Sequence, residues 1–361
     1  MSRARQVSQL IGASNTHLVS TPATFSNTVT VAASGITYSD STVQLTAPAG
    51  FGFKNRIING AMMIDQRNAG GSANTSVLQG TTYTLDRWCY YNDVVSKRSI
   101  QQSSDAPAGF SKSILVTVIA TDTVGPQQYF RQAIEGYNLQ DLNWGTANAQ
   151  SATLSFWVKS SVTGQHGGTI QSSNSNYSYP FAYTIVSANT WEYKTILITG
   201  PTSGTWSTTN GVGASLMFEH GVGYQKNTAG VWTATNATSS TGSVNLCATN
   251  GATWYITGVQ LEKGSTATAF DYRSYPYEFS LCQRYYYKYD PTVSVYGITA
   301  PYNSSNWWIM IQLPVRMRAV PTVSATYTGG SMTPYITADR VHFNAGTQSI
   351  YVDTLAVSSE L

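Results

Sequence analysis

Aromatic side chains that lie beside amides and hydroxyls are the residues of this sequence with the clearest capacity for binding chemistry. Phe, Trp and Tyr make up 12% of the 361 residues. Such rings offer flat faces to sugar rings, while nearby amides and hydroxyls can hydrogen-bond to the sugar hydroxyls. Polar loop stretches combine the two residue types, and their aromatic side chains form the predicted glycan-binding set: Tyr177, Tyr179, Trp206, Trp232, Trp307 and Trp308.

Tyr177, Tyr179 and Trp232 are the members of this set that we expect to be most exposed, because polar loop residues surround them. Trp and Tyr are, however, also residues of cores and of protein interfaces. An alternative therefore stays open for each of these rings, in which it packs in the core or between subunits.

No residue pattern in the sequence predicts a catalytic site. The histidines have no metal-ligand spacing and form no H-E-x-x-H motif, and His166 belongs to G-Q-H-G-G, a predicted exposed turn. A G-x-S-x-G motif is absent, which argues against a serine hydrolase. The sparse carboxylates leave a glycosidase pair open, although most follow predicted turns and strand ends. Asp65 and Asp86 lie near Arg67 and Arg87, and we interpret them as ion pairs or turn caps.

Charged residues are scarce, at 10% of the chain, and the formal net charge of +3 is spread too thinly for a nucleic-acid-binding stripe. The three cysteines, Cys89, Cys247 and Cys282, form no CxxC pair, so we expect buried reduced thiols rather than disulfides or a zinc site. No D-x-D loop places a calcium ion, and we expect no cofactor. Neither a signal peptide nor an apolar stretch of about 20 residues is present, so no membrane insertion is expected.

Short alternating strands predict a β-sandwich between residues 51 and 277. Apolar and polar residues alternate with a period of two, which is the pattern of half-buried strands, and turn residues separate the runs. The predicted strands are Ser113–Ala120, Ala152–Lys159, Ala182–Val186, Glu192–Thr199, Ala214–Glu219 and Thr253–Leu261. One run, Gln127–Leu139, has helical spacing, and we expect one short turn or helix there, crossing the edge of the sandwich.

Residues 278–361 predict a second and smaller β-sandwich, so the chain as a whole is predicted to be all-β. High aromatic density continues through this part of the sequence. Its predicted strands are Arg284–Lys288, Trp307–Leu313, Pro321–Tyr327, Val341–Asn344 and Ser349–Ala356.

Three motifs resemble segments of tail fibre and related structural proteins of tailed bacteriophages. The first motif is N-R-I-I-N-G-A-M-M-I-D from Asn55, followed by Y-T-L-D-R-W from Tyr83. The second is G-V-Q-L-E-K-G…F-D-Y-R…E-F-S-L-C-Q-R-Y-Y-Y-K from Gly258, and the third is L-P-V-R-M-R-A-V-P from Leu313. The resemblance implies a jelly roll like that of carbohydrate-binding modules, in which aromatic side chains hold sugar rings and a calcium ion can be bound.

Residues 1–50 are unlike the rest of the chain, because their alternating stretches are too short to form a stable sheet alone. Trimeric phage fibres interleave such strands between copies. We therefore predict a stem for trimerisation and virion attachment, with a flexible arm as the alternative.

Together these features predict a non-enzymatic structural protein of a tailed-phage virion, a homotrimeric tail fibre component that binds host-surface glycans. Other virion proteins are expected to bind residues 1–50, and the protein is expected to assemble in the host cytoplasm and leave by lysis. Three alternatives stay open. They are a capsid-attached head fibre or decoration protein, a purely architectural adaptor and a glycan-degrading depolymerase.

Overall fold

The computed structural model describes residues 54–71, 79–93, 97–124, 127–289, 298–303, 306–328, 332–345 and 351–361, together with strands β1 (Ile36–Thr37) and β2 (Val43–Gln44). The chain divides into two compact units, Met1–Gly52 and Phe53–Leu361. β1 and β2 pair in antiparallel register, and the rest of the predicted stem lies outside the described residues. The stem, the trimer and the domain boundaries at residues 50 and 277 stay predictions.

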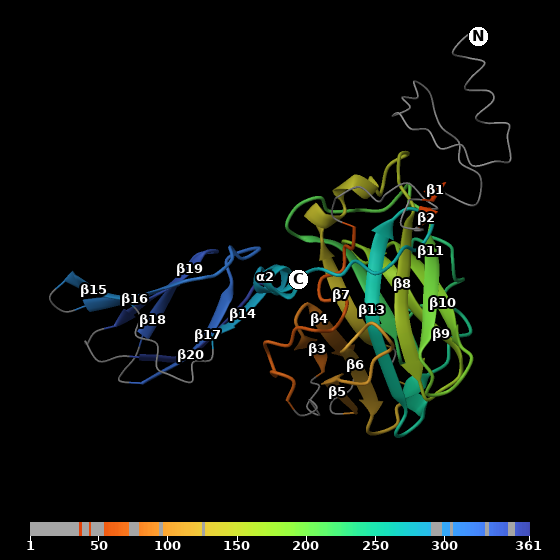
Figure 1. The fold of residues 1–361 in the computed structure, drawn as a ribbon, viewed down its shortest axis with the longest axis horizontal. Coiled ribbons are helices and arrows are strands. Elements are labelled where there is room, and N and C mark those ends of the chain that lie inside the picture. Colours follow the sequence, from red (N-terminus) through yellow and green to blue (C-terminus); the bar gives the residue numbers. More distant parts are fainter. Residues whose placement is uncertain are drawn as a thin grey trace, which may run out of the picture. The chain divides into compact units, whose positions relative to one another are not determined.

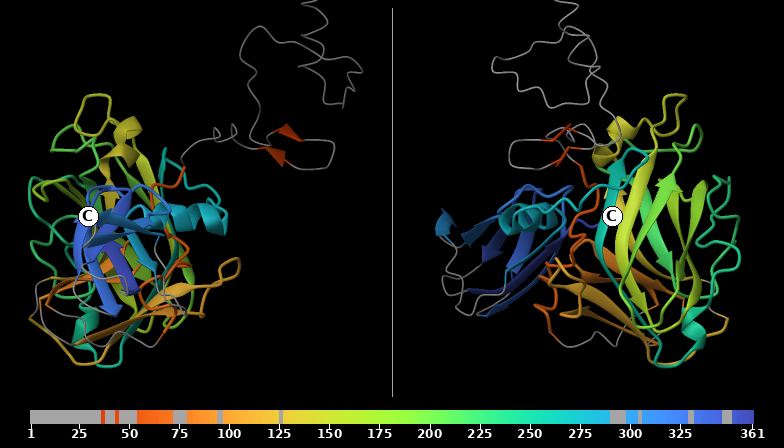
Figure 2. Two further views of the ribbon diagram at one scale, coloured as in Figure 1. Left: turned by 90° about the vertical axis from the view of Figure 1, so that its left-hand side faces the viewer. Right: turned by 45° about the vertical axis from the view of Figure 1, so that its right-hand side comes forward.

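Two antiparallel sheets lie face to face and form the predicted jelly-roll β-sandwich (Figure 1, Figure 2). The order of the six-stranded sheet is β10-β9-β12-β7-β4-β3, with strands Ser178–Ile185 (β10), Gly164–Ser172 (β9), Val212–Glu219 (β12), Gln128–Glu135 (β7), Trp88–Asn92 (β4) and Gly80–Leu85 (β3). The order of the five-stranded sheet is β11-β8-β13-β6-β5, with strands Glu192–Ile198 (β11), Ala152–Ser160 (β8), Thr253–Lys263 (β13), Ser113–Val118 (β6) and Arg98–Ser103 (β5). All six strands predicted for this region are confirmed, whereas β3, β4, β5, β7 and β9 were not predicted as strands.

The core between the two sheets follows from the alternation along each strand. On β8, Leu154, Phe156 and Val158 are fully buried, and the intervening side chains belong to the opposite face of the sheet. Trp88 of β4 stacks on Phe130 of β7 with ring centroids 4.7 Å apart. Burial of side chains of this size stabilises the folded state by roughly 1.5–3 kcal/mol each, so these inward rows hold the two sheets together.

The predicted short turn or helix at Gln127–Leu139 is wrong for most of this run, which is strand β7. Both faces of β7 are covered, so apolar residues occur on either side of it and imitate a helical spacing. On one face the side chain of Gln132 hydrogen-bonds to the backbone N–H and C=O of Ile58. Helical geometry is limited to the short 3-10 turns that follow, Gly136–Asn138 and Gln140–Leu142.

The predicted exposed turn around His166 is also wrong, because these residues belong to β9. A Cβ atom on Gly168 would lie 2.3 Å from the Met217 carbonyl oxygen, so this glycine allows close packing rather than a turn. The His166 ring is buried against Tyr183, and its Nε2 lies 2.9 Å from the Val162 carbonyl oxygen. Burial lowers the pKa of His166, as expected for a neutral imidazole in the protein interior.

The C-terminal strands form two further sheets around their own apolar core, in agreement with the predicted second sandwich. One sheet has the order β14-β20-β17, with strands Tyr286–Tyr289 (β14), Tyr351–Ser358 (β20) and Thr322–Thr328 (β17). The other has the order β15-β16-β19-β18, with strands Ile298–Asn303 (β15), Asn306–Gln312 (β16), Arg340–Ala345 (β19) and Met332–Ile336 (β18). Both groups of sheets belong to the unit Phe53–Leu361.

Helix α2 (Tyr275–Gln283) connects the last strand of the sandwich to β14 and was not predicted. Pro276 lies in its first turn, where the missing N–H has no helical partner to lose. Directly after the helix, the Arg284 guanidinium forms a 2.6 Å ion pair with Glu135 of β7, and Tyr285 donates a hydrogen bond to the same carboxylate. These contacts tie the start of the C-terminal sheets to the sandwich.

Arg67 and Arg87 have a different ionic partner from the one expected. Both guanidinium groups pair with Glu360, near the end of the described chain, and neither pairs with Asp65 or Asp86. Asp65 instead caps a turn, because its carboxylate accepts hydrogen bonds from the N–H groups of Asn68 and Gly70. Asp86 is buried and accepts from Gln66, and burial raises its pKa to about 7.

Candidate functional site

Four of the six predicted glycan-binding residues lie in one aromatic group, the tryptophan cluster, which we define as Trp144, Tyr177, Tyr179, Trp206 and Trp232. Trp232 is at its centre and has ring centroids of the other four within 5.0 to 6.0 Å. The ring of Tyr177 stacks on it with an interplanar angle of 4°. Trp206 and Trp232 also pack against the core of the sandwich. The structure thus brings these four residues together, as packing partners of one another.

The three indole N–H groups and the Tyr179 hydroxyl of the tryptophan cluster are engaged within the protein. Trp232 Nε1 donates to the Thr199 carbonyl oxygen at 2.7 Å, and Trp206 Nε1 donates to that of Ser203 at 3.0 Å. The Tyr179 hydroxyl donates to the Leu197 carbonyl oxygen, also at 3.0 Å. These bonds fix the loops at this edge of the sandwich, which is a structural task.

The expectation that Tyr179 is exposed is wrong, since only 3% of this residue is accessible. It belongs to β10, and its side chain enters the core, where burial raises the pKa of its hydroxyl. Tyr177, Trp206 and Trp232 are half-buried. Trp307 and Trp308 lie on β16, and their side chains are outside the described part of the structure. Glycan binding by these six residues stays a prediction.

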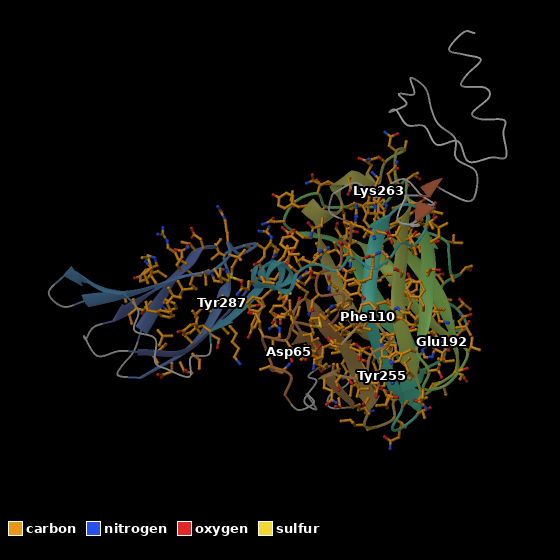
Figure 3. All side chains as sticks on the ribbon, viewed as in Figure 1. Asp65, Phe110, Glu192, Tyr255, Lys263 and Tyr287 are labelled. Carbon is orange, nitrogen blue, oxygen red and sulfur yellow. The ribbon has the colours of Figure 1, made fainter. Side chains whose placement is uncertain are left out.

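A second aromatic group covers the outer face of the five-stranded sheet, and none of its members was in the predicted set. We define this sheet-face groove by Phe110, Trp157, Tyr193, Phe270, Tyr272 and Tyr275. Figure 3 shows Phe110 and Tyr255 over this sheet. Trp157 of β8 points outward because its neighbours Phe156 and Val158 point into the core. Tyr193 of β11 is its cross-strand partner, and the two ring centroids are 5.3 Å apart.

Three rings stand together in the middle of the sheet-face groove. The centroids of Phe110, Phe270 and Tyr272 are 4.9 to 5.6 Å apart, and the Tyr272 hydroxyl donates to the Gly109 carbonyl oxygen at 2.8 Å. Phe110 lies directly on Gly258, where a Cβ atom would be 2.7 Å from the ring. Gly258 has φ +61° at a bulge of β13, so glycine is required here both for its backbone and for space.

Two hollows share the rings of Phe110, Phe270 and Tyr272. The larger hollow, of about 480 Å³, is lined by sheet residues that include Ser155, Trp157 and Tyr193. The smaller hollow, of about 240 Å³, is lined by the opening segment of the sandwich, the 109–111 loop and the start of α2. Its polar lining residues are Asn55, Asn59, Ser111, Asp271, Arg273 and Glu278. The groove is therefore a concave surface with flat rings in its centre and polar groups at one end, which is the usual composition of a ligand site.

Three rings of the groove are exposed, whereas no ring of the tryptophan cluster is; Phe110, Trp157 and Phe270 are half-buried. Tyr272 is 61% exposed, Tyr275 is 56% exposed and Tyr193 is 44% exposed. Exposed aromatic residues that line a common hollow, rather than standing singly, are typical of interaction surfaces. The arrangement can bind a flat, partly apolar molecule with hydroxyl groups; it presents no nucleophile–base pair.

A fixed charge pair lies on the same sheet face, one row beyond Trp157. Lys159 of β8 lies over the ring of Tyr255 at 4.2 Å and forms an ion pair with Asp105. Trp191 Nε1 donates to the same carboxylate at 3.0 Å. The hydrogen bond from Lys159 lowers the pKa of Asp105, so this carboxylate is ionised at neutral pH.

Sequence reasoning missed the groove because its residues come from four separate segments of the chain. The available signal was the density of aromatic residues around Phe270. Among the described residues, no group of His, Cys, Asp and Glu could hold a metal ion, and no helix is long and apolar enough to cross a membrane. Cys89, Cys247 and Cys282 are buried free thiols.

Comparison with known proteins yields similar structures but no related sequence. No family model matches the chain, and no curated protein matches it. One similar structure is the enzymatically active domain of bacteriophage CBA120 tailspike protein 4, which is 17% identical over 58% of this chain and 21% of that chain, with a TM-score of 0.33. Another is a sugar-binding protein of Bacteroides thetaiotaomicron, 11% identical over 58% of this chain and all of that chain, with a TM-score of 0.34. A third is TmCBM61 in complex with β-1,4-galactotriose, 10% identical over 58% and 99% of the two chains, with a TM-score of 0.30.

This chain thus spans about a fifth of the length of the tailspike domain it resembles. Structural neighbours of the chain include a phage tailspike domain and carbohydrate-binding modules with jelly-roll folds. Likeness at these identities and TM-scores says nothing of what this chain itself binds.

Proposed function

We propose that this chain is a glycan-binding structural protein and that the sheet-face groove is its binding site. The observation that carries the proposal is the row of accessible rings at Tyr193, Tyr272 and Tyr275, which line or border two hollows on one sheet face. Sugar rings have apolar C–H faces that stack on such side chains, and their hydroxyl groups suit the amides and carboxylates of the smaller hollow.

The place of the protein in the virion is a further part of the proposal, and it is supported by the sequence motifs that resemble phage fibre proteins. We propose a homotrimeric tail fibre component whose residues 1–50 attach to other virion proteins. Several copies on one particle would multiply weak individual sites into firm attachment to a host surface. A capsid-attached fibre with the same modules is the second candidate for this placement. Labelling of the chain on intact virions separates the two, since signal on the head contradicts the tail assignment.

Glycan binding is tested with the full-length chain on an array of bacterial surface polysaccharides and defined oligosaccharides. Trp157→Ala and Tyr272→Ala each remove one ring of the groove, and Tyr177→Ala is the matched removal of a half-buried ring from the tryptophan cluster. We expect the groove variants to lose binding at least tenfold and Tyr177→Ala to retain it. Loss confined to Tyr177→Ala would move the site to the tryptophan cluster, and absence of wild-type binding to every glycan would refute glycan binding.

The same glycans test the expectation that the protein is not an enzyme. Asp271 and Glu278 both line the smaller hollow, but both carboxylates are tied to Arg273 and to backbone N–H groups. A glycosidase instead needs one carboxylic acid that is free to donate a proton and a second carboxylate across the bond. We expect no release of reducing sugar from any bound glycan, and sustained turnover would overturn this part of the proposal.

A further inference from the structure

The smaller hollow has more acidic than basic side chains, and this difference in charge bears on which class of glycan it can bind. Two carboxylates, Asp271 and Glu278, and one guanidinium, Arg273, line it. The larger hollow is lined by uncharged residues. The charge that a ligand meets therefore depends on how these three side chains are oriented.

The guanidinium of Arg273 is turned toward the protein. Its side chain is only 8% exposed. Its Nη1 donates to the Ile57 carbonyl oxygen at 3.2 Å and to the Glu278 carboxylate, and its Nη2 donates to the Asn55 carbonyl oxygen. Its Nε lies 3.5 Å from Asp271 Oδ2. Backbone carbonyls and carboxylates thus surround this cation, which leaves little of it for an anionic ligand.

The carboxylate of Asp271 is the more accessible of the two acids, with 30% of its side chain exposed against 15% for Glu278. The Asn55 backbone N–H points at Asp271 Oδ2 from 3.4 Å, which is a long contact. A carboxylate of this kind keeps accepting capacity for hydroxyl groups that approach from the solvent side. Two lysines near the larger hollow are also engaged within the protein: Lys159 pairs with Asp105, and Lys54 Nζ donates to the carbonyl oxygen of Ala269, a lining residue.

We propose that the groove is specific for neutral glycans and that Asp271 is the residue that sets this specificity. This inference rests on the proposed function. A neutral sugar donates hydroxyl hydrogen bonds to the Asp271 carboxylate while its ring lies against the exposed aromatic side chains. A uronic acid, sialic acid or sulfated sugar brings a negative charge to the same carboxylate, where like charges repel and the buried Arg273 gives no compensation.

The experiment measures binding of the full-length chain to matched glycan pairs: oligosaccharides of glucose, galactose and mannose, each beside its uronic acid counterpart of the same linkage and length. We expect at least a tenfold preference for the neutral member of whichever pair is bound. This preference for the neutral member should become smaller when the salt concentration is raised from 20 mM to 500 mM. Salt screens charge repulsion but leaves the shape of the groove unchanged. Equal or tighter binding of the uronic acid member would overturn the inference.

Asp271→Asn assigns the preference to this residue. It removes the charge at nearly constant size, and we expect it to raise affinity for uronic acid oligosaccharides at least threefold while neutral ones bind equally or more weakly. Asp339→Asn, the same change at an exposed turn between β18 and β19, is the control. It should change neither the affinity for uronic acid oligosaccharides nor the affinity for neutral ones. An unaltered preference in Asp271→Asn would show that Asp271 does not set it. Wild-type protein that binds neither member of any pair, nor any glycan of the wider array, would refute the proposed function itself.

Discussion

The tryptophan cluster and the sheet-face groove are built from the same residue types and differ in where their rings point. In the cluster, Trp232 contacts four other rings, and its indole N–H is engaged by a backbone carbonyl. In the groove, the rings of Tyr193, Tyr272 and Tyr275 keep about half of their surface in solvent. The density of aromatic residues therefore does not distinguish a mini-core from a binding surface, whereas the accessibility of the rings does.

This comparison teaches that a polar neighbourhood in the sequence is a poor guide to exposure. Ser, Asn and Thr surround Tyr177 and Trp232 along the chain, yet the loops fold so that these two rings stack on each other and are half-buried. The groove rings come from the regular face of a sheet and from segments that cross it, and Tyr193, Tyr272 and Tyr275 among them stay exposed.

The largest expected effect is on stability, in the tryptophan cluster. Trp232→Ala should reduce the free energy of unfolding by about 3 kcal/mol, because it removes four ring contacts and leaves a cavity. Chemical denaturation followed by circular dichroism measures the loss. Trp157→Ala, which removes an indole from the groove, is the control and should cost about 1 kcal/mol. Equal losses of unfolding free energy in Trp232→Ala and Trp157→Ala would mean that the groove ring is as important for stability as the cluster ring.

A somewhat smaller effect is expected from the support beneath the groove. Gly258→Ala should destabilise the protein by about 2 kcal/mol, because the new Cβ meets Phe110 and a left-handed backbone disfavours alanine. The Phe110 ring must then move, and glycan affinity should fall with it. Gly251 also has a positive φ, but no atom lies near the position of an added Cβ, so Gly251→Ala should destabilise the protein less. Unchanged affinity in a folded Gly258→Ala protein would show that the ring position does not matter.

An effect on binding alone is expected at the most exposed ring. Tyr272→Ala should lower glycan affinity about tenfold, equivalent to roughly 1.4 kcal/mol, and should change the free energy of unfolding by less than about 1 kcal/mol. Isothermal titration with a glycan identified on the array measures the first quantity, and denaturation measures the second. A large stability loss with unchanged affinity would place Tyr272 with the structural rings.

The smallest expected effect is the loss of one hydrogen bond in the tryptophan cluster. Tyr179→Phe removes the bond to the Leu197 carbonyl oxygen and should cost about 1 kcal/mol of stability without changing glycan affinity. Thermal unfolding measures the change in stability, and calorimetric titration measures the glycan affinity. Lower affinity in this variant would restore Tyr179 to the binding site and weaken the contrast between the regions.

The sequence by itself determined the all-β class and most of the sandwich strands. Period-two alternation identified β6, β8, β11, β12 and β13 nearly to their ends, because apolar side chains recur at every second position of each strand. It failed at β7 and β9, whose sequences, Q-Y-F-R-Q-A-I-E and G-Q-H-G-G-T-I-Q-S, do not alternate between apolar and polar residues. The turn interpretation of the glycines of β9 failed for a related reason, since they serve close contact between strands.

Tertiary structure alone decided which aromatic residues face solvent and which ionic groups pair. Phe110, Trp157 and Tyr272 become neighbours only when β8, β13 and the crossing segment assemble, and Arg87 finds Glu360 across 273 residues of chain. Local sequence cannot encode such contacts, because it fixes a side chain's direction within one strand but not what another segment brings to cover it. The 109–111 loop and the crossing segment cover only part of the outer sheet face, so Tyr193 and Tyr272 stay exposed there. That exposure is a property of the assembled fold rather than of any single stretch of residues.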